Sequence, residues 1–247
     1  KKYAQKRIES GDTVDAWYPQ LHSFAVGLEG SPDLAAAQKV ADHLGTIHHE
    51  IKFTIQEGLD AVRDVIYNIE TYDVTTIRAS TPMYLMARVI KSMGIKMVLS
   101  GEGSDELFGG YSMYSKIVNE TYQKLYNYKL LNLNRTELQR VDRCSMAFSV
   151  ESRVPFLDKR LVQMAQSIPS LWKINDGIEK WCVRQAFKND LPDYIINRKK
   201  NPLSHSSGLH EWVRLYKIRF ARIHREFGYY LNEQLHKDFS FLLQENG

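Results

Sequence analysis

Residues 98–111 (VLSGEGSDELFGGY) hold the residue types best suited to chemistry in this chain, because glycines and carboxylates crowd together there. Glycine lets backbone N–H groups approach a ligand closely, and successive N–H groups in a turn form an anion-binding nest. Carboxylates beside a bound phosphate need a bridging cation, and Mg²⁺ favours carboxylate and phosphate oxygens. The stretch therefore suggests a nucleotide phosphate with Mg²⁺. A solvated acidic turn between a strand and a helix explains the composition equally well.

Length and composition narrow the class of protein. The chain has 247 residues, of which 43% are hydrophobic and 25% charged, so we expect a globular fold with one large or two smaller domains. The net charge of +4 suits anionic substrates and is too mild to indicate nucleic acid. No run approaches the roughly 18 apolar residues of a membrane span. Cys144 and Cys182 lack metal or disulfide spacing, which fits a reducing, cytoplasmic compartment.

The first half of the chain alternates strand and helix signals. Strands are predicted at 22–28, 47–53 and 95–99, the last of them buried. Helices are predicted after Ser31, which can cap a helix with Pro32 at its first position, and after a capping box of Thr54 and Glu57. A third helix is expected to open at 80–82 and to end at Gly94.

This alternation predicts a parallel sheet with helices on both faces. Ligands of such sheets bind beyond the carboxyl ends of the strands, where we place 26–28, 75–78 and the glycine-rich stretch. From about residue 114 the pattern is helical, with a rigid turn at 153–158. We therefore expect a Rossmann-like part over 1–113 and a helical part over 114–247.

Several motifs in order resemble the synthetase domain of the glutamine-hydrolysing asparagine synthetases, which belong to the ATP pyrophosphatases. They are 73–84 (DVTTIRASTPMY), 100–111 (SGEGSDELFGGY), 151–158 (ESRVPFLD) and the basic cluster with Arg198 and Lys200. The resemblance implies an α/β fold, with a Rossmann-like parallel sheet of the adenine-nucleotide α-hydrolase type followed by a mainly helical region.

The resemblance also implies an activity. Enzymes of this family use ATP and Mg²⁺ to convert the side-chain carboxylate of aspartate into β-aspartyl-AMP, and ammonia then displaces AMP. The ammonia comes from glutamine, which a separate glutaminase domain hydrolyses. A homodimer is compatible with the resemblance, which leaves the oligomeric state open.

The resemblance assigns the nucleotide contacts by position. Val26, Ser100 and Gly101 match backbone and side-chain contacts to the adenylate. Asp105 matches a carboxylate that holds Mg²⁺ and pyrophosphate, and Lys200 matches a lysine over the phosphates. A solvated surface lysine is the plain alternative for Lys200.

The remaining assignments concern the reacting centre. Glu102 matches the residue needed to form the adenylate and to handle the incoming amine, and its own loop contains no cation to pair with it. Thr75 and Arg78 match residues around the intermediate and the transition state. A helix cap is the alternative for Thr75, and a surface ion pair is the alternative for Arg78.

This sequence departs from the family in two respects, and two other functions remain as alternatives. The pyrophosphate loop of the family, Ser-Gly-Gly-Leu-Asp-Ser, and its glutaminase domain are absent, and we expect both upstream of residue 1. Residues 112–135 are also shorter than the family pattern. One alternative is a β-lactam synthetase, although these enzymes have tyrosine at the position of Glu102. The other is a non-catalytic module that keeps the fold for binding.

Overall fold

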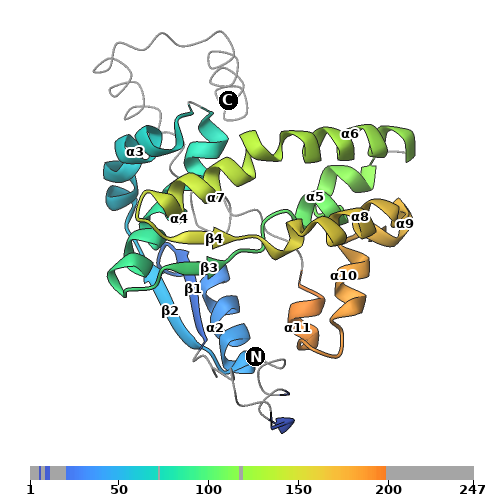
Figure 1. Cartoon of the computed structure of the whole chain (residues 1–247), viewed down its shortest axis with the longest axis horizontal. Coiled ribbons are helices and arrows are strands. Elements are labelled where there is room, and N and C mark those ends of the chain that lie inside the picture. The colour runs from blue at the N-terminus through green and yellow to red at the C-terminus, as the bar shows by residue number, and fades with distance from the viewer. Residues whose placement is uncertain (1–5, 7–8, 12–20, 72, 117–118, 199–247) are drawn as a thin grey trace.

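The computed structural model describes residues 6, 9–11, 21–71, 73–116 and 119–198 (Figure 1). The described chain is mixed α/β and mostly helical, and its longer strands run in parallel pairs. No described helix combines the length and the apolar character that a membrane span requires.

The first parallel pair is a short strand–helix–strand unit that local signals predict correctly. β1 (His22–Gly27) pairs with β2 (Ile47–Lys52), with His22 opposite Ile47, and α2 (Pro32–Leu44) connects them. The Ser31 side chain accepts a hydrogen bond from the Asp33 N–H at 3.3 Å, and Gly45 ends the helix with φ +60°. The Ser31 cap is the one that the sequence predicts, and the left-handed conformation at Gly45 is typical of a helix end.

The second parallel pair joins the two halves of the chain. β3 (Met97–Leu99) pairs with β4 (Glu151–Arg153), a strand that is not predicted from the sequence and whose last residue begins the predicted turn at 153–158. The described strands thus form two separate parallel pairs. The predicted burial of 95–99 is wrong, because Met97 is 41% and Leu99 70% exposed. β3 is paired along one edge only, and the described part of the chain places no strand on its other edge.

The two longest described helices pack against each other, and the second of them contacts β1. α3 (Ile55–Ile69) begins with the predicted capping box, in which Thr54 and Glu57 exchange hydrogen bonds. α4 (Val74–Ser92) begins six residues before the predicted start at Ser80, because the Asp73 carboxylate accepts the Thr76 N–H at 2.6 Å and caps it. Pro82, which belongs to the predicted opening of this helix at 80–82, therefore lies inside α4.

The second half is helical apart from β4 and one antiparallel hairpin. Its helices are α6 (Asn119–Asn132), α7 (Glu137–Met146), α8 (Lys159–Ser167), α9 (Ser170–Lys173), α10 (Trp181–Ala186) and α11 (Asp193–Ile196). The hairpin consists of β5 (Ile174–Asn175) and β6 (Ile178–Glu179). In Figure 1, α7 lies against α3 and α4, whereas α8 to α11 gather at the other end of β3 and β4.

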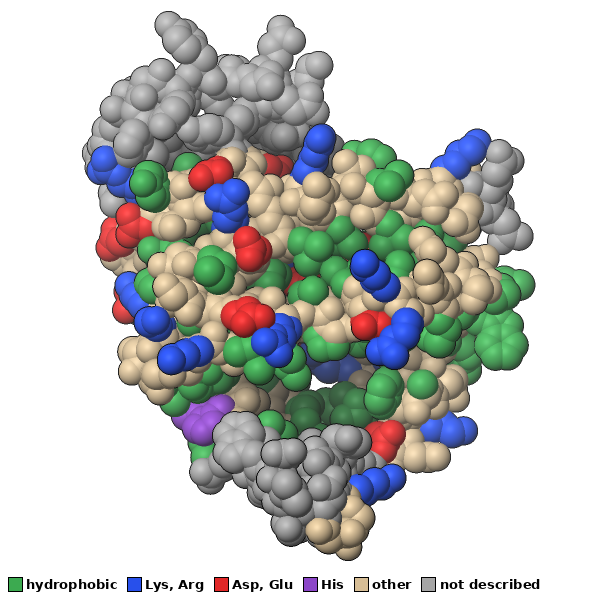
Figure 2. Space-filling model, viewed as in Figure 1, with side chains coloured by type: hydrophobic (Ala, Val, Ile, Leu, Met, Phe, Trp, Pro, Cys, Tyr) green, Lys and Arg blue, Asp and Glu red, His purple; other side chains and the backbone are tan. Residues whose placement is uncertain are grey.

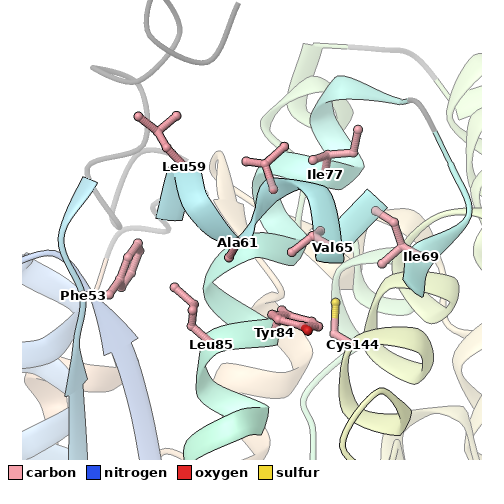
Figure 3. Packing of buried hydrophobic residues seen from close by; sticks show 10 residues of the cluster. Phe53, Leu59, Ala61, Val65, Ile69, Ile77, Tyr84, Leu85 and Cys144 are labelled. Carbon is pink, nitrogen blue, oxygen red and sulfur yellow. The ribbon is translucent and has the colours of Figure 1, made fainter. Parts of the chain in front are cut away.

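The main core lies between α3, α4 and α7 (Figure 3). Ile69 and Ile77 are fully buried, and Cys144 of α7 completes the cluster at 1% exposure. One face of α3 is apolar and buried, since Val62 and Ile69 are both 0% exposed. This core holds the start of α4 against α7, and thus places Thr75 and Arg78 relative to the second half.

Replacing Ile69 by alanine tests this core. Since Ile69 is 0% exposed, Ile69→Ala is expected to lower the free energy of unfolding by about 2–5 kcal/mol through lost burial and a residual cavity. Urea titration followed by circular dichroism measures it. Tyr67→Ala on the same helix is the control, because Tyr67 is 83% exposed and should change stability by less than about 0.5 kcal/mol. Equal losses for the two variants would contradict this packing.

Candidate functional site: the glycine loop and its cations

The glycine-rich stretch leaves β3 and turns into a short helix. The Ser100 N–H donates to the Arg153 carbonyl at 2.8 Å, which extends the β3–β4 ladder by one residue. α5 (Ser104–Phe108) follows, with Gly103 at φ +87° before it and Gly109 at φ +69° after it. A Cβ on Gly103 would lie 2.5 Å from Leu157, so this turn needs glycine for both its conformation and its contact. We call residues 100–111 the glycine loop.

Asp105 is held by a lysine from the second half of the chain. Lys180 Nζ lies 2.8 Å from Asp105 Oδ1 and donates to Ser104 Oγ at 2.8 Å. The backbone at Gly110 passes so close that a Cβ there would lie 1.8 Å from Asp105 Oδ1 and 2.5 Å from Lys180 Cε. Lys180 was not predicted from the sequence, and it places a cation where phosphates are expected.

Glu102 also has a cationic partner, contrary to the expectation drawn from its own loop. Arg140 Nη2 of α7 donates to Glu102 Oε1 at 3.0 Å, and the two side chains are only 15% and 21% exposed. The loop itself supplies no cation, but the fold brings one from 38 positions away. Glu102 therefore has a structural contact besides any role in chemistry.

The third carboxylate of the loop, Glu106, is buried. Glu106 is 1% exposed and accepts a hydrogen bond from the Tyr111 hydroxyl, which also reaches Glu137 Oε1 of α7 at 3.4 Å. Burial raises the pKa of Glu106 above its ordinary value, and the Tyr111 hydrogen bond partly opposes this shift. Tyr111 thus joins the glycine loop to α7 between two carboxylates, and burial raises the pKa of its own hydroxyl.

The other predicted residues lie outside this loop. Val26 is half-buried on β1 and packs against the main core, so a ligand would meet chiefly its backbone. Thr75 is exposed in the first turn of α4 and Arg78 is half-buried one turn later, so 75–78 is helical rather than a loop after a strand. The cap of α4 is Asp73, not Thr75. Lys200 lies outside the described residues.

A hollow lies beside Lys180, the partner of Asp105. It measures about 380 Å³ and lies between α2 and the α10–α11 region, where Figure 2 shows the molecule opened between two layers. Its walls are largely apolar, with Val40 and Phe187 among them, and Lys180 and Arg184 add positive charge. The volume lies within the range of small-molecule sites. Because Lys180 also contacts Asp105, the hollow adjoins the predicted phosphate position.

The donor set fits a magnesium ion that is shared with phosphates. Among the described residues, no three His, Cys, Asp or Glu side chains gather closely enough to hold a metal ion by themselves. Asp105 is a partly exposed carboxylate on the loop, whereas Glu106 is buried under Tyr111. Mg²⁺ is commonly bound by one or two carboxylates together with substrate phosphates. Asp105 is suited to that arrangement.

The close passage at Gly110 gives a direct test of the Asp105–Lys180 pair. A methyl group at residue 110 would displace both side chains, so Gly110→Ala is expected to lower the affinity for Mg·pyrophosphate by at least about tenfold, the equivalent of 1.4 kcal/mol. Isothermal calorimetry measures this affinity. Gly101→Ala is the folding control, because a Cβ at Gly101 meets nothing within 4 Å and should leave the unfolding midpoint unchanged. Unchanged pyrophosphate affinity in Gly110→Ala would show that the pair does not shape the site.

The buried Glu106 predicts a specific pH dependence. Its pKa is higher in the folded than in the unfolded chain, so its contribution to stability is full below about pH 4.3 and is lost as pH rises through the folded pKa. A glutamine side chain does not titrate. The free energy of unfolding of Glu106→Gln is therefore expected to rise relative to that of the parent as pH rises. Unfolding curves between pH 4 and 8 measure the difference. Glu57→Gln should show no such gain over this range, because hydrogen bonds from Thr54 lower the Glu57 pKa, so its contribution to stability changes only below about pH 4.3. A flat Glu106 difference would contradict this account.

Comparison with known proteins agrees with the motifs. The Asparagine synthase family model matches residues 3–126 and 119–226. The chain is 56% identical over 217 residues to asparagine synthetase B (glutamine-hydrolyzing) of Escherichia coli strain K12, covering 86% of this chain and 39% of that protein. It is 50% identical over 215 residues to the glutamine-hydrolyzing asparagine synthetase of Sandersonia aurantiaca, covering 83% and 41%. The chain thus spans about two fifths of the length of these relatives.

The family match covers most of the chain, including the glycine loop, α4 and the segments that supply Arg140 and Lys180. On these grounds the chain belongs to the asparagine synthase family.

Proposed function

We propose that this chain forms the ATP-dependent part of an enzyme that amidates aspartate to asparagine through β-aspartyl-AMP, with release of pyrophosphate and then AMP. The observation that carries the proposal is the pairing on the glycine loop. Two of its carboxylates, Glu102 and Asp105, each meet a cation from the second half of the chain, at 3.0 and 2.8 Å. Family membership and the names of the relatives support the same reaction.

The Asp105 end of the loop suits the leaving group. Adenylation builds negative charge on the α-phosphate and on pyrophosphate, and fixed cations near that charge stabilise the transition state. Lys180 already lies between Ser104 and Asp105, so its ammonium can turn to a phosphate without a large movement. Mg²⁺, when bound at Asp105, would neutralise further charge on the phosphates. Lys200 remains a proposed second cation there.

The Glu102 end of the loop suits the amination step. Attack by ammonia on the acyl-adenylate releases a proton, and Glu102 is the proposed acceptor. Arg140 holds one carboxylate oxygen of Glu102 and so limits its rotation, which favours a defined position toward the substrate. We propose that Ser100, Gly101 and the Val26 backbone contact the adenylate.

The start of α4 suits the acyl-adenylate. Thr75 lies in the first turn of a 19-residue helix, whose N-terminal dipole favours negative charge. Arg78 lies one turn further along and could meet the phosphate of the intermediate. These roles rest on the resemblance and on the helix position together.

The wider organisation follows the family. We propose that both parallel strand pairs belong to one Rossmann-like sheet. Residues 1–113 supply three of its strands, and β4 comes from the helical part that follows. The β1–α2–β2 unit supports this proposal. Ammonia would come from glutamine at a glutaminase domain such as the names of the relatives imply. We further propose a cytoplasmic location.

Glu102→Gln in the complete protein that contains this chain tests the mechanism. The change keeps size and most hydrogen bonding but removes the charge and the proton acceptor. We expect ATP affinity within about twofold of the parent, and asparagine formation from free ammonia reduced by at least about 100-fold. Calorimetry measures the affinity, and chromatography measures asparagine, AMP and pyrophosphate.

The control is another carboxylate that pairs with α7. Glu70 lies 3.0 Å from Arg143, but this pair is exposed, so Glu70→Gln should leave both measurements unchanged. Asparagine formed at the parent rate by Glu102→Gln would make Glu102 a loop residue only. If Glu102→Gln lost both ATP binding and the folded state, the main role of Glu102 would be structural, through its ion pair with Arg140. Release of ADP and phosphate by the parent would contradict the reaction class.

A further inference from the structure

Beneath the C-terminal end of the glycine loop, three buried tyrosines lie together. Tyr114, Tyr122 and Tyr126 are only 2%, 4% and 1% exposed, and their neighbouring ring centroids are 4.8 and 6.1 Å apart. Within the described part of the chain, none of the three hydroxyls has a hydrogen-bond partner. Buried hydroxyl groups are normally satisfied, so three unsatisfied ones in a single cluster call for an explanation.

A buried lysine enters the same cluster. Lys173 of α9 is 2% exposed, and its ammonium lies 4.0 Å from the centroid of the Tyr126 ring. No carboxylate of the described residues pairs with it. Burial lowers the Lys173 pKa to about 8, so the side chain is still mostly protonated at pH 7. A buried charge is costly unless it is paired, and the ring face of Tyr126 offsets only part of that cost.

The four groups share one chemical need. A lysine ammonium can only donate hydrogen bonds, and each tyrosine hydroxyl has a proton to donate. Their common complement is an acceptor that also carries negative charge. An ordered water would satisfy a hydroxyl but would leave the ammonium charge uncompensated.

The cluster contacts the glycine loop directly. A Cβ on Gly109, at the end of α5, would lie 3.1 Å from the Tyr122 hydroxyl and 3.1 Å from Ile174, the residue after Lys173. A monatomic anion is the smallest species with the required properties.

We propose that Lys173, Tyr114, Tyr122 and Tyr126 form a binding site for one halide-sized anion, such as chloride, directly beneath the glycine loop. The site does not depend on the proposed reaction, because none of its four residues is assigned a part in it. Through Gly109, a bound anion would also stabilise the end of the loop.

Thermal unfolding of the complete protein at constant ionic strength tests the site. Sodium gluconate is replaced stepwise by sodium chloride, and in a second series by sodium bromide. An anion that binds the folded state raises the unfolding midpoint with a saturable dependence on its concentration. We expect this rise for the parent and its loss in Lys173→Met, which keeps the length of the side chain but removes the charge.

Two further variants make the result specific. Lys159→Met removes an exposed lysine of α8 and should keep the full halide response. Tyr126→Phe keeps the ring under Lys173 but removes one donor, so the chloride concentration at half-saturation should rise at least about threefold. This variant also covers the case in which Lys173→Met does not fold.

A crystal grown in bromide gives the decisive reading. Anomalous scattering between Lys173 and the three tyrosines would support the site. An ordered water there, or an equal halide response in the parent, Lys173→Met and Tyr126→Phe, would overturn it.

Discussion

The ion pair between Asp105 and Lys180 is the constraint on which the arrangement of the site depends. It ties the glycine loop to α10 at a point where the Gly110 backbone leaves no room for a side chain. Arg140 and Glu102 make a second tie three residues earlier, to α7. Both pairs are largely shielded from water, so their attraction is screened less than that of exposed surface pairs. The loop is thereby held between two helices that lie far from it in sequence.

Buried polar groups extend this support below the loop. Tyr111 connects Glu106 to Glu137, and the tyrosine cluster packs against Gly109. Such networks are costly when a member lacks its partner, because buried polar groups lose hydration without compensation. The buried side of the loop is thus specified by hydrogen bonds and packing, whereas Gly101 is exposed and Glu102 and Asp105 are partly exposed. This division suits a loop that must present carboxylates at defined positions.

The second half of the chain contributes as much to the site as the first. It supplies β4, which pairs with β3, the short strand before the loop. It also supplies both cations that pair with Glu102 and Asp105. From the sequence, Lys200 is the site residue expected from this half, and neither Arg140 nor Lys180 is predicted. A three-residue strand of Glu151, Ser152 and Arg153 has no apolar alternation, so its pairing with β3 leaves no pattern in the sequence.

The sequence by itself determined what depends on neighbours a few residues apart. The capping box of Thr54 and Glu57, the Ser31 cap and the order of motifs that identifies the family are of this kind. Only the tertiary structure decided the exposure of β3 and the partners of Glu102 and Asp105. Arg140 is 38 positions from Glu102, and Lys180 is 76 positions from Ser104. The physical reason is that caps arise from contacts within one turn, whereas charge pairing and burial depend on which distant segments the core brings together.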